Sequence, residues 1–346
     1  MKVALLTYFK TLSYGATLQT YATVKVFESL GHEVELINLE IPNPYGRIKG
    51  LLLFPKWIKT WIFRKKYFKH VTRKYVDSAE LRQNPPQADI FVVGSDQTWN
   101  LDISGDKASS FFLDFVKDNS KKVTYAASFG KERLENTKWI TVEEVTSLLH
   151  QFEHIAIREK SGKDFLASMG IDSVQVVDPA LLFKDYNELV GDVCDRNELV
   201  LFKVDNSAAF YDKAAIVGRN ISLPICSLGS LRRIKGMRCP YPDGLEGWMR
   251  RLVSARYILT DSFHGLVISL LYHKQFVLIL GDPRKTTRLR SLAHLVGLDD
   301  RIMDVETPVS DIITKLQQQI DYGTVDEILE KEREFSLSYL KSILVK

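Results

Sequence analysis

A histidine in a polar turn is the residue of this 346-residue chain best suited to acid–base chemistry. His264 follows the apolar run Tyr257 to Thr260 and precedes the apolar helical segment Leu266 to Tyr272. In open α/β sheets, ligands collect outside the carboxyl ends of the strands, where a helix amino terminus offers N–H groups to an anion. His264 is therefore placed either to exchange a proton with a phosphorylated substrate or simply to cap the helix.

A second group of polar residues follows the apolar run Ile90 to Val93. Its hydroxyl, carboxylate, amide and indole groups supply the donors, acceptors and stacking face that a sugar requires. We expect this loop to bind a sugar through Ser95, Asp96, Gln97, Trp99 and Asn100. Tyr14, Gly15 and Gln19 follow the first apolar run; Gly15 permits close backbone approach, so these residues either face the same ligand or form a tight packing turn.

Two arginines are candidates for holding an anionic ligand. Arg158 follows the run Ile155 to Ile157, and Arg288 lies in a basic segment beyond the strand after His264. A planar guanidinium binds two oxygens of a phosphate or carboxylate at once. The alternatives are a structural ion-pair network between Arg158 and Glu159 and a solvated basic face around Arg288.

Other familiar motifs are absent or weak. His150 to His154 matches an HxxEH zinc pattern, but His154 runs directly into a β-like segment, so we expect no metal site. No phosphate-binding GxxxxGK[ST] loop and no GxSxG elbow occur. The three cysteines lack the close spacing of a zinc or redox site.

Alternating apolar runs and helical segments predict the framework that positions these residues. Val3 to Leu6, a helix, and Val34 to Ile37 form a βαβ opening, and a second set of strands begins at Leu199. This pattern is typical of α/β proteins with parallel sheets and predicts two Rossmann-like lobes facing a central cleft. The expected domains are residues 1–188 and 189–320, followed by a helix at 321–346 that packs back on the first lobe.

Charge is distributed unevenly along the chain. The stretch 41–76 carries ten Lys or Arg residues interleaved with aromatics and contains no acidic residue. It is assigned to the first lobe as an insertion, and it either buries its aromatics in the core or lies on an anionic membrane or a lipid-linked substrate. No nucleic-acid motif is present. Without a signal-peptide pattern or a spanning segment, the chain is expected to be cytoplasmic, with peripheral membrane contact as one option.

Several of these motifs, taken in order, resemble the polysaccharide pyruvyl transferase family. The matching segments are Tyr14–Ala22, Gly94–Asn100, Tyr125–Gly130, Arg158–Gly162, Asp178–Leu182 and Thr260–Gly265, and the later Arg288 also fits. The resemblance implies a fold similar to GT-B glycosyltransferases. It also implies transfer of pyruvate from phosphoenolpyruvate, as co-substrate, to a sugar of a cell-surface or exopolysaccharide precursor as a ketal.

One departure from the family pattern affects the donor site. Members of the family often carry an Arg-Leu-His triplet whose arginine helps to hold phosphoenolpyruvate, whereas this chain has Ser262, Phe263 and His264. We expect His264 to be the general acid, with Arg158, Ser262, Gly265 and Arg288 at the donor. A nucleotide-sugar glycosyltransferase and a non-catalytic glycan-binding protein remain alternatives.

Overall fold

A computed structural model describes residues 1–41, 52–117, 120–204, 207–230, 233–281 and 286–344. The described residues of Met1–Pro44, Arg64–Phe183 and Lys331–Lys346 form one compact unit, here called unit 1. Those of Tyr45–Phe63 and Lys184–Glu330 form the other, unit 2. Among these residues, no helix is both long enough and apolar enough to cross a bilayer.

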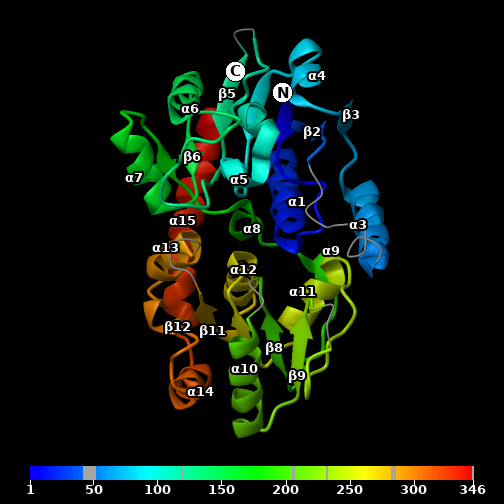
Figure 1. Ribbon diagram of the computed structural model, residues 1–346, viewed down its shortest axis with the longest axis vertical. Helices are drawn as coiled ribbons and strands as arrows, with labels where there is room; N and C mark the ends of the chain where they lie inside the picture. The colour runs from blue at the N-terminus through cyan, green and yellow to red at the C-terminus, as the bar shows by residue number, and fades with distance from the viewer. Residues whose placement is uncertain (42–51, 118–119, 205–206, 231–232, 282–285, 345–346) are drawn as a thin grey trace. The chain divides into compact units, whose positions relative to one another are not determined.

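Unit 1 is built on a five-stranded parallel sheet of order β3-β2-β1-β4-β5 (Figure 1). The residues of β1 from Val3 to Leu6 are at most 1% exposed, as expected for a central parallel strand covered on both faces. A short parallel pair, β6-β7, follows β5. The strands are β1 (Lys2–Leu6), β2 (Glu33–Leu39), β3 (Val71–Tyr75), β4 (Ile90–Val93), β5 (Lys121–Thr124), β6 (Ala156–Ile157) and β7 (Val174–Gln175).

Unit 2 holds a second five-stranded parallel sheet, of order β12-β11-β10-β8-β9 (Figure 1). Renumbered within the unit, this is the doubly wound order 2-1-3-4-5. The predicted α/β class with two Rossmann-like units is confirmed. The strands are β8 (Leu199–Phe202), β9 (Ile225–Leu228), β10 (Tyr257–Thr260), β11 (Gln275–Leu280) and β12 (Ile302–Asp304).

Helices cover both sheets, and several carry the end signals that the sequence predicts. Thr141 and Glu144 form a reciprocal capping box that starts α6. The helices of unit 1 are α1 (Tyr14–Ser29), α4 (Ser78–Gln83), α5 (Leu101–Ser104), η1 (Gly105–Phe112), α6 (Val142–Leu149), α7 (Lys160–Ser168) and α8 (Pro179–Leu182). Those of unit 2 are α9 (Asn187–Val190), α10 (Ala208–Asn220), α11 (Leu245–Val253), α12 (Phe263–Leu271), α13 (Thr287–Leu295), η3 (Asp299–Arg301) and α14 (Val309–Gln317), while α3 (Phe54–Tyr67) and α15 (Tyr322–Ile343) have residues in both units.

The unit boundaries differ from the predicted ones in two places. Unit 2 takes over after Phe183, where the sequence placed the change after residue 188. The sequence assigns the basic stretch 41–76 whole to the first lobe, but its described residues 52–63 belong to unit 2. In α15, the residues from Lys331 onward belong to unit 1, where Ser336 accepts the Val177 N–H at 3.0 Å.

Helix α3 buries two polar residues and exposes two tryptophans, unlike an ordinary surface helix. Lys56 and Thr60 are buried, at 8% and 6% exposed, whereas Trp57 and Trp61 are each 47% exposed. The alternative in which the aromatics of this stretch join the core holds for Phe63, Tyr67 and Phe68 but is wrong for the two tryptophans. Burial lowers the pKa of Lys56 from 10.5 to about 7, because the charged ammonium loses its hydration.

This burial predicts a pH dependence of stability. Between pH 7 and about 10.5 the unfolded chain holds the Lys56 proton and the folded chain does not, so the free energy of unfolding rises with pH across this window. The Lys56→Met variant lacks this contribution. We expect the difference in unfolding free energy between wild type and variant to change by up to about 1.4 kcal/mol per pH unit there.

Urea denaturation of both proteins at several pH values in that window measures the difference. Lys59→Met is the matched control, since the Lys59 side chain is 53% exposed on the same helix. Parallel curves for wild type and Lys56→Met from pH 7 to 10 would contradict the assignment.

Candidate functional site

In unit 1, the sequence motifs meet where the winding of the sheet reverses. Strands β1 and β4 are neighbours, but the chain continues from them to opposite sides, and ligands of open α/β sheets bind outside the carboxyl ends at such a switch point. Thr7 follows β1 and Ser95 lies just beyond β4. The Thr7 hydroxyl donates to the Ser95 carbonyl at 3.0 Å, joining the two strand ends.

Asp178 is the centre of a buried polar network at this edge. Its carboxylate accepts from the Ser95 hydroxyl at 2.8 Å, from Arg158 Nη1 at 2.5 Å and from the Ala180 N–H at 2.9 Å. The side chains of Arg158 and Asp178 are 2% and 0% exposed. Burial lowers the pKa of Arg158, but the carboxylates of Asp178, Asp96 and Glu159 outweigh it and raise that pKa.

This geometry corrects two of the predicted roles. Arg158 is engaged by Asp178 as a structural ion pair, so donor binding through a free guanidinium, our prediction, is not supported. Ser95 is fully buried and hydrogen-bonded to Asp178 and to the Ala126 carbonyl, so its hydroxyl is not offered to an acceptor. The ion-pair alternative for Arg158 is the better one, with Asp178 rather than Glu159 as its closest partner.

Glu159 has a different task from the one the sequence suggested. Its buried carboxylate accepts from the Ser128 hydroxyl at 2.8 Å and from the Phe129 N–H at 3.2 Å. The next residue, Gly130, has φ +68°, and a Cβ there would lie 2.0 Å from the Gln97 amide oxygen. Glycine is therefore required so that the loop carrying Gln97 can pack against this turn.

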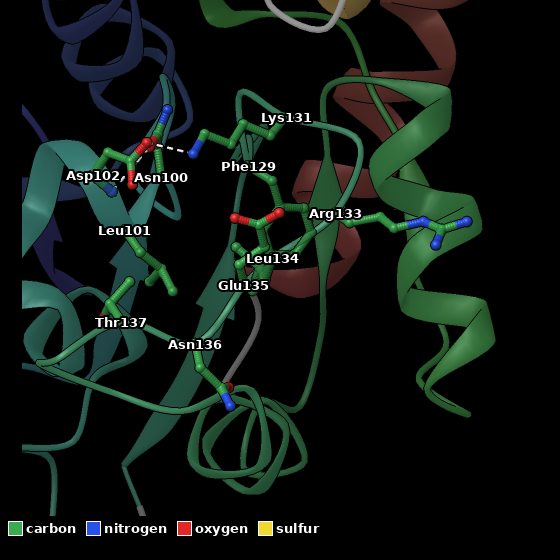
Figure 2. Close-up of a pocket in the computed structure, with 10 residues that line it drawn as sticks. All are labelled: Asn100, Leu101, Asp102, Phe129, Lys131, Arg133, Leu134, Glu135, Asn136 and Thr137. Carbon is green, nitrogen blue, oxygen red and sulfur yellow. Dashed lines mark hydrogen bonds and ion pairs between the residues drawn. The ribbon is translucent and has the colours of Figure 1, made fainter.

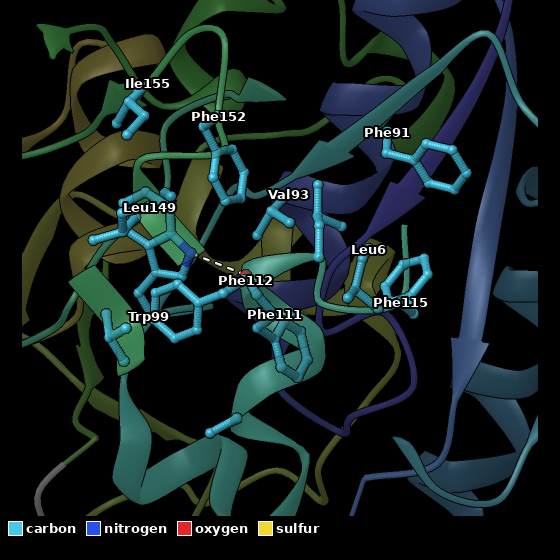
Figure 3. Close-up of a cluster of buried hydrophobic side chains, with 14 of the residues drawn as sticks. Leu6, Phe91, Val93, Trp99, Phe111, Phe112, Phe115, Leu149, Phe152 and Ile155 are labelled. Atoms are coloured by element: carbon cyan, nitrogen blue, oxygen red, sulfur yellow. Dashed lines mark hydrogen bonds between the residues drawn. The ribbon is translucent and has the colours of Figure 1, made fainter. Parts of the chain in front are cut away.

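Trp99 belongs to the hydrophobic core, which corrects its predicted role as a stacking face for a sugar. The indole is 0% exposed and donates to the Phe111 carbonyl at 3.0 Å (Figure 3). Its ring lies parallel to that of Phe112, with centroids 5.6 Å apart, and it also contacts Phe129 and Phe152. The sequence alone does not indicate whether a tryptophan in a polar loop points into the core or toward a ligand.

Of the predicted acceptor loop, Asp96 and Gln97 remain half-buried. Asn100 is 7% exposed; its amide donates to Gln97 at 3.0 Å and its carbonyl caps α5. Asn100 also lines a pocket of about 60 Å³, beside the Lys131–Asp102 ion pair (Figure 2). That volume is far below the roughly 300 Å³ of a small-molecule site, so this pocket does not hold a sugar by itself.

The residues after β1 are likewise packed inside unit 1. Tyr14 and Gly15 are buried in the first turn of α1. Gln19 is 0% exposed and donates to the Thr7 hydroxyl at 2.9 Å and the Ala16 carbonyl at 3.0 Å. Gln19 therefore supports the β1 end internally, which corrects its placement against a ligand; the packing-turn alternative describes this segment.

Unit 2 has its switch point between β8 and β10, and a buried ion pair joins the ends of these strands. Lys203 Nζ lies 2.6 Å from Asp261, with side chains 5% and 7% exposed. Asp261 also accepts the Val204 N–H at 2.6 Å. Sequence reasoning missed Lys203, although its position directly after the first strand of the second set was a usable signal.

Ser262 and Gly265 have structural roles in starting α12. The Ser262 hydroxyl accepts the Gly265 N–H at 3.3 Å as an N-cap. A Cβ on Gly265 would lie 2.6 Å from the Thr260 hydroxyl, so glycine permits helix and strand to approach closely. The Gly265 N–H is thus occupied by the cap, which corrects our expectation that it binds the donor.

His264 lies in the first turn of α12, beyond the carboxyl end of β10. Its side chain is buried at 6% exposed, and its ring meets the Phe263 ring edge-on at 5.3 Å between centroids. It follows Asp261 by three residues, at the edge where that residue pairs with Lys203. His264 and the Lys203–Asp261 pair therefore both follow strands whose carboxyl ends meet at the switch point of unit 2.

Arg288 is half-buried in the first turn of α13, a helix that contacts α12. Its neighbours Arg284 and Lys285 lie outside the described residues. Helix α13 follows β11, the strand beside β10. Arg288 thus belongs to the same unit as His264, whereas Arg158 belongs to unit 1.

A hollow in unit 2 lies at the edge of the sheet opposite the one that carries His264. It has a volume of about 400 Å³ and is lined by residues that precede β8, β10 and β11, among them Arg196, Arg256 and Lys274. Those are the amino ends of the strands, opposite the edge that carries His264.

In unit 1, α6 ends at Leu149, so the HxxEH pattern has no helix carrying both of its histidines.

Comparison with known proteins finds one matching family model. The family model described as polysaccharide pyruvyl transferase matches residues 14–283. No curated protein matches the sequence.

Solved structures show the fold. The UDP-GlcNAc 2-epimerase from Neisseria meningitidis bound to UDP-GlcNAc aligns over 99% of both chains, with a TM-score of 0.55 and 11% identity. The epimerase from Methanocaldococcus jannaschii in complex with UDP-GlcNAc and UDP covers 98% of this chain and 100% of its own, with a TM-score of 0.54 and 14% identity. The Thermobaculum terrenum O-GlcNAc transferase aligns over 99% of this chain and 66% of its own, at 0.51 and 12%. The fold is thus that of GT-B glycosyltransferases and epimerases, as the sequence predicted.

The Asp178 network generates a stability prediction. Asp178→Ala leaves Arg158 buried without its closest carboxylate, and removing one partner of a buried ion pair costs about 3–5 kcal/mol. Asp102→Ala is the control, because Asp102 is 62% exposed and its pair with Lys131 should contribute at most about 1 kcal/mol. Denaturant unfolding monitored by circular dichroism compares the two variants. Equal losses in the free energy of unfolding would show that the Asp178 network does not stabilise unit 1 more than an exposed ion pair does.

Proposed function

Because the chain belongs to the polysaccharide pyruvyl transferase family, we propose that it transfers pyruvate from phosphoenolpyruvate to a sugar as a ketal. The observation that carries the proposal is the position of His264 in the first turn of α12, at the switch point of unit 2. A histidine there meets the need of the reaction for a proton donor beside an anion site.

In the proposed reaction, His264 begins as imidazolium and gives its proton to the methylene carbon of phosphoenolpyruvate. The adjacent carbon becomes electrophilic, and a sugar hydroxyl attacks it and returns a proton to the imidazole. A second hydroxyl of the sugar then displaces the phosphate at the same carbon, its proton passes to the departing phosphate, and the ring closes. The products are the cyclic ketal and inorganic phosphate, so no oxidant and no further co-substrate is needed.

The donor carries a phosphate and a carboxylate and therefore needs fixed cations. With Ser262 acting as a helix cap and Arg158 held in unit 1 by Asp178, we assign this role to Arg288. Lys203 is paired with Asp261, so it contributes as a hydrogen-bond donor in an already balanced pair rather than as a free charge. The acceptor side is assigned to Asp96 and Gln97, the half-buried polar residues of the unit 1 loop.

The acceptor in this proposal is a sugar or lipid-linked glycan of a surface or exopolysaccharide precursor. The donor is a metabolite of the cytoplasm, and this is where we place the reaction. A nucleotide-sugar donor is the competing hypothesis, because solved structures with this fold hold UDP-GlcNAc. A glycan-binding role without catalysis is the third, and it predicts that His264 is dispensable.

We expect His264→Ala to remain folded and to lower pyruvyl transfer at least about a hundredfold, as is usual when a general acid is lost. Phosphate release from phosphoenolpyruvate in the presence of acceptor sugars measures the rate. His294→Ala is the control, because His294 is an 80% exposed histidine of the same unit. A folded His264→Ala protein with wild-type turnover would remove this histidine from the chemistry.

Donor identity is tested by calorimetric titration with phosphoenolpyruvate and, separately, with UDP-GlcNAc. Arg288→Ala should weaken phosphoenolpyruvate binding by roughly 1.5–3 kcal/mol, the usual contribution of a charge-assisted hydrogen bond. Arg290→Ala, on the exposed side of the same helix, should leave it unchanged. Tight binding of UDP-GlcNAc without binding of phosphoenolpyruvate would favour the glycosyltransferase alternative.

A further inference from the structure

Helix α3 presents a continuous apolar surface to solvent. Phe54, Trp57, Ile58, Trp61 and Ile62 recur at the three- and four-residue spacing of one helix face and are 37–53% exposed. We call these five residues the α3 outer face. The Phe54 and Trp57 rings stack on each other at 6.1 Å between centroids, which extends the aromatic surface along the helix.

The opposite face of α3 accounts for the orientation of the helix. Leu53, Phe63 and Tyr67 are buried there, so the helix is anchored through its inner side while its tryptophans point outward. Monomeric soluble proteins rarely leave such large contiguous apolar patches in water, and where they occur they mark an interaction surface. A scattered pair of exposed apolar residues would need no such explanation, but five on one helix face do.

The charges around the α3 outer face identify its partner. Lys65, Lys66 and Lys69 are exposed at the carboxyl end of the helix, and no acidic residue occurs anywhere between residues 41 and 76. Nearer its amino end, Lys59 is 53% exposed and pairs with Asp243. Helices that lie in the interface of an anionic bilayer have this composition, with tryptophan, phenylalanine and isoleucine beside lysines on the helix surface.

We propose that the α3 outer face inserts into the headgroup region of an anionic lipid bilayer, with the neighbouring lysines contacting the lipid phosphates. The aromatic rings supply the apolar burial and the lysines supply the preference for anionic lipid. Insertion of the α3 outer face differs from a purely electrostatic contact because its aromatic rings enter the bilayer. Lys56, one of the basic residues of the stretch, is buried and is not available to lipid. The inference stands on α3 alone and is independent of the donor chemistry proposed above.

The test uses the full-length protein and vesicles of equimolar phosphatidylglycerol and phosphatidylcholine, compared with phosphatidylcholine alone. We expect co-sedimentation with the anionic vesicles, weakening as salt is raised, and little with the neutral ones. Trp57→Gln combined with Trp61→Gln should lower vesicle affinity at least about tenfold, because it removes the two largest apolar side chains of the surface. Lys65→Gln with Lys66→Gln should abolish the preference for anionic lipid while retaining the residual apolar contact.

Trp139→Gln is the matched control, since Trp139 is also 47% exposed but lies in unit 1, away from α3. It should bind vesicles as wild type does. Because Trp99 and Trp248 are buried, a blue shift of tryptophan fluorescence on vesicle addition that survives in Trp139→Gln reports insertion of Trp57 and Trp61.

Three results would overturn the proposal. The first is wild-type protein that ignores anionic vesicles at low salt, and the second is a Trp57→Gln/Trp61→Gln protein that still binds them fully. The third is a wild-type dimer in light scattering that the double tryptophan variant converts to monomer, which would make the α3 outer face a contact between copies of the chain. None of these results depends on pyruvyl transfer, so the proposed function is judged separately.

Discussion

The reversal of winding within each parallel sheet is the constraint on which the arrangement of this protein depends. Where neighbouring strands lead to helices on opposite faces, their carboxyl ends are left uncovered between the following loops. Each unit has one such point, between β1 and β4 and between β8 and β10. The Thr7–Ser95 hydrogen bond joins the strand ends at the first of these places, and the Lys203–Asp261 ion pair joins those at the second.

The two switch points use their polar residues differently. In unit 1 most of them are turned inward: Asp178 binds Arg158 and Ser95, so the motif residues hold the loops in place. Burying a charged pair is costly, and the hydrogen bonds that the Asp178 carboxylate accepts from Ser95, Arg158 and Ala180 offset part of that cost. In unit 2 the Lys203–Asp261 pair joins the carboxyl ends of β8 and β10, and His264 begins the helix that follows β10, so this is the edge to which the proposed chemistry is assigned.

In unit 1 packing draws polar side chains into the interior. In α3 packing also leaves large apolar side chains exposed to solvent. An ordinary surface helix packs its tryptophans against the protein core. In this chain Leu53, Phe63 and Tyr67 are the buried apolar residues on the inner side of the α3 segment, which leaves Trp57 and Trp61 exposed. Lys56 is carried into the interior by its position on that inner side, at a cost that appears as its lowered pKa. The lipid interface that we propose as its partner would account for an exposed apolar surface that water alone disfavours.

The sequence by itself determined the α/β class, the two Rossmann-like units, the family and the position of His264 at a strand end, because strand periodicity and the order of short motifs are local properties. It did not determine which motif side chains face inward. Trp99, Gln19 and Arg158 were plausible ligand contacts until tertiary packing gave each a buried partner, and Lys203 gained its meaning only when β8 and β10 became neighbours. Partners such as Arg158 and Asp178, or Lys203 and Asp261, are far apart in the chain. Their pairing is set by sheet order and by the direction in which each side chain leaves its strand, which only the folded structure fixes.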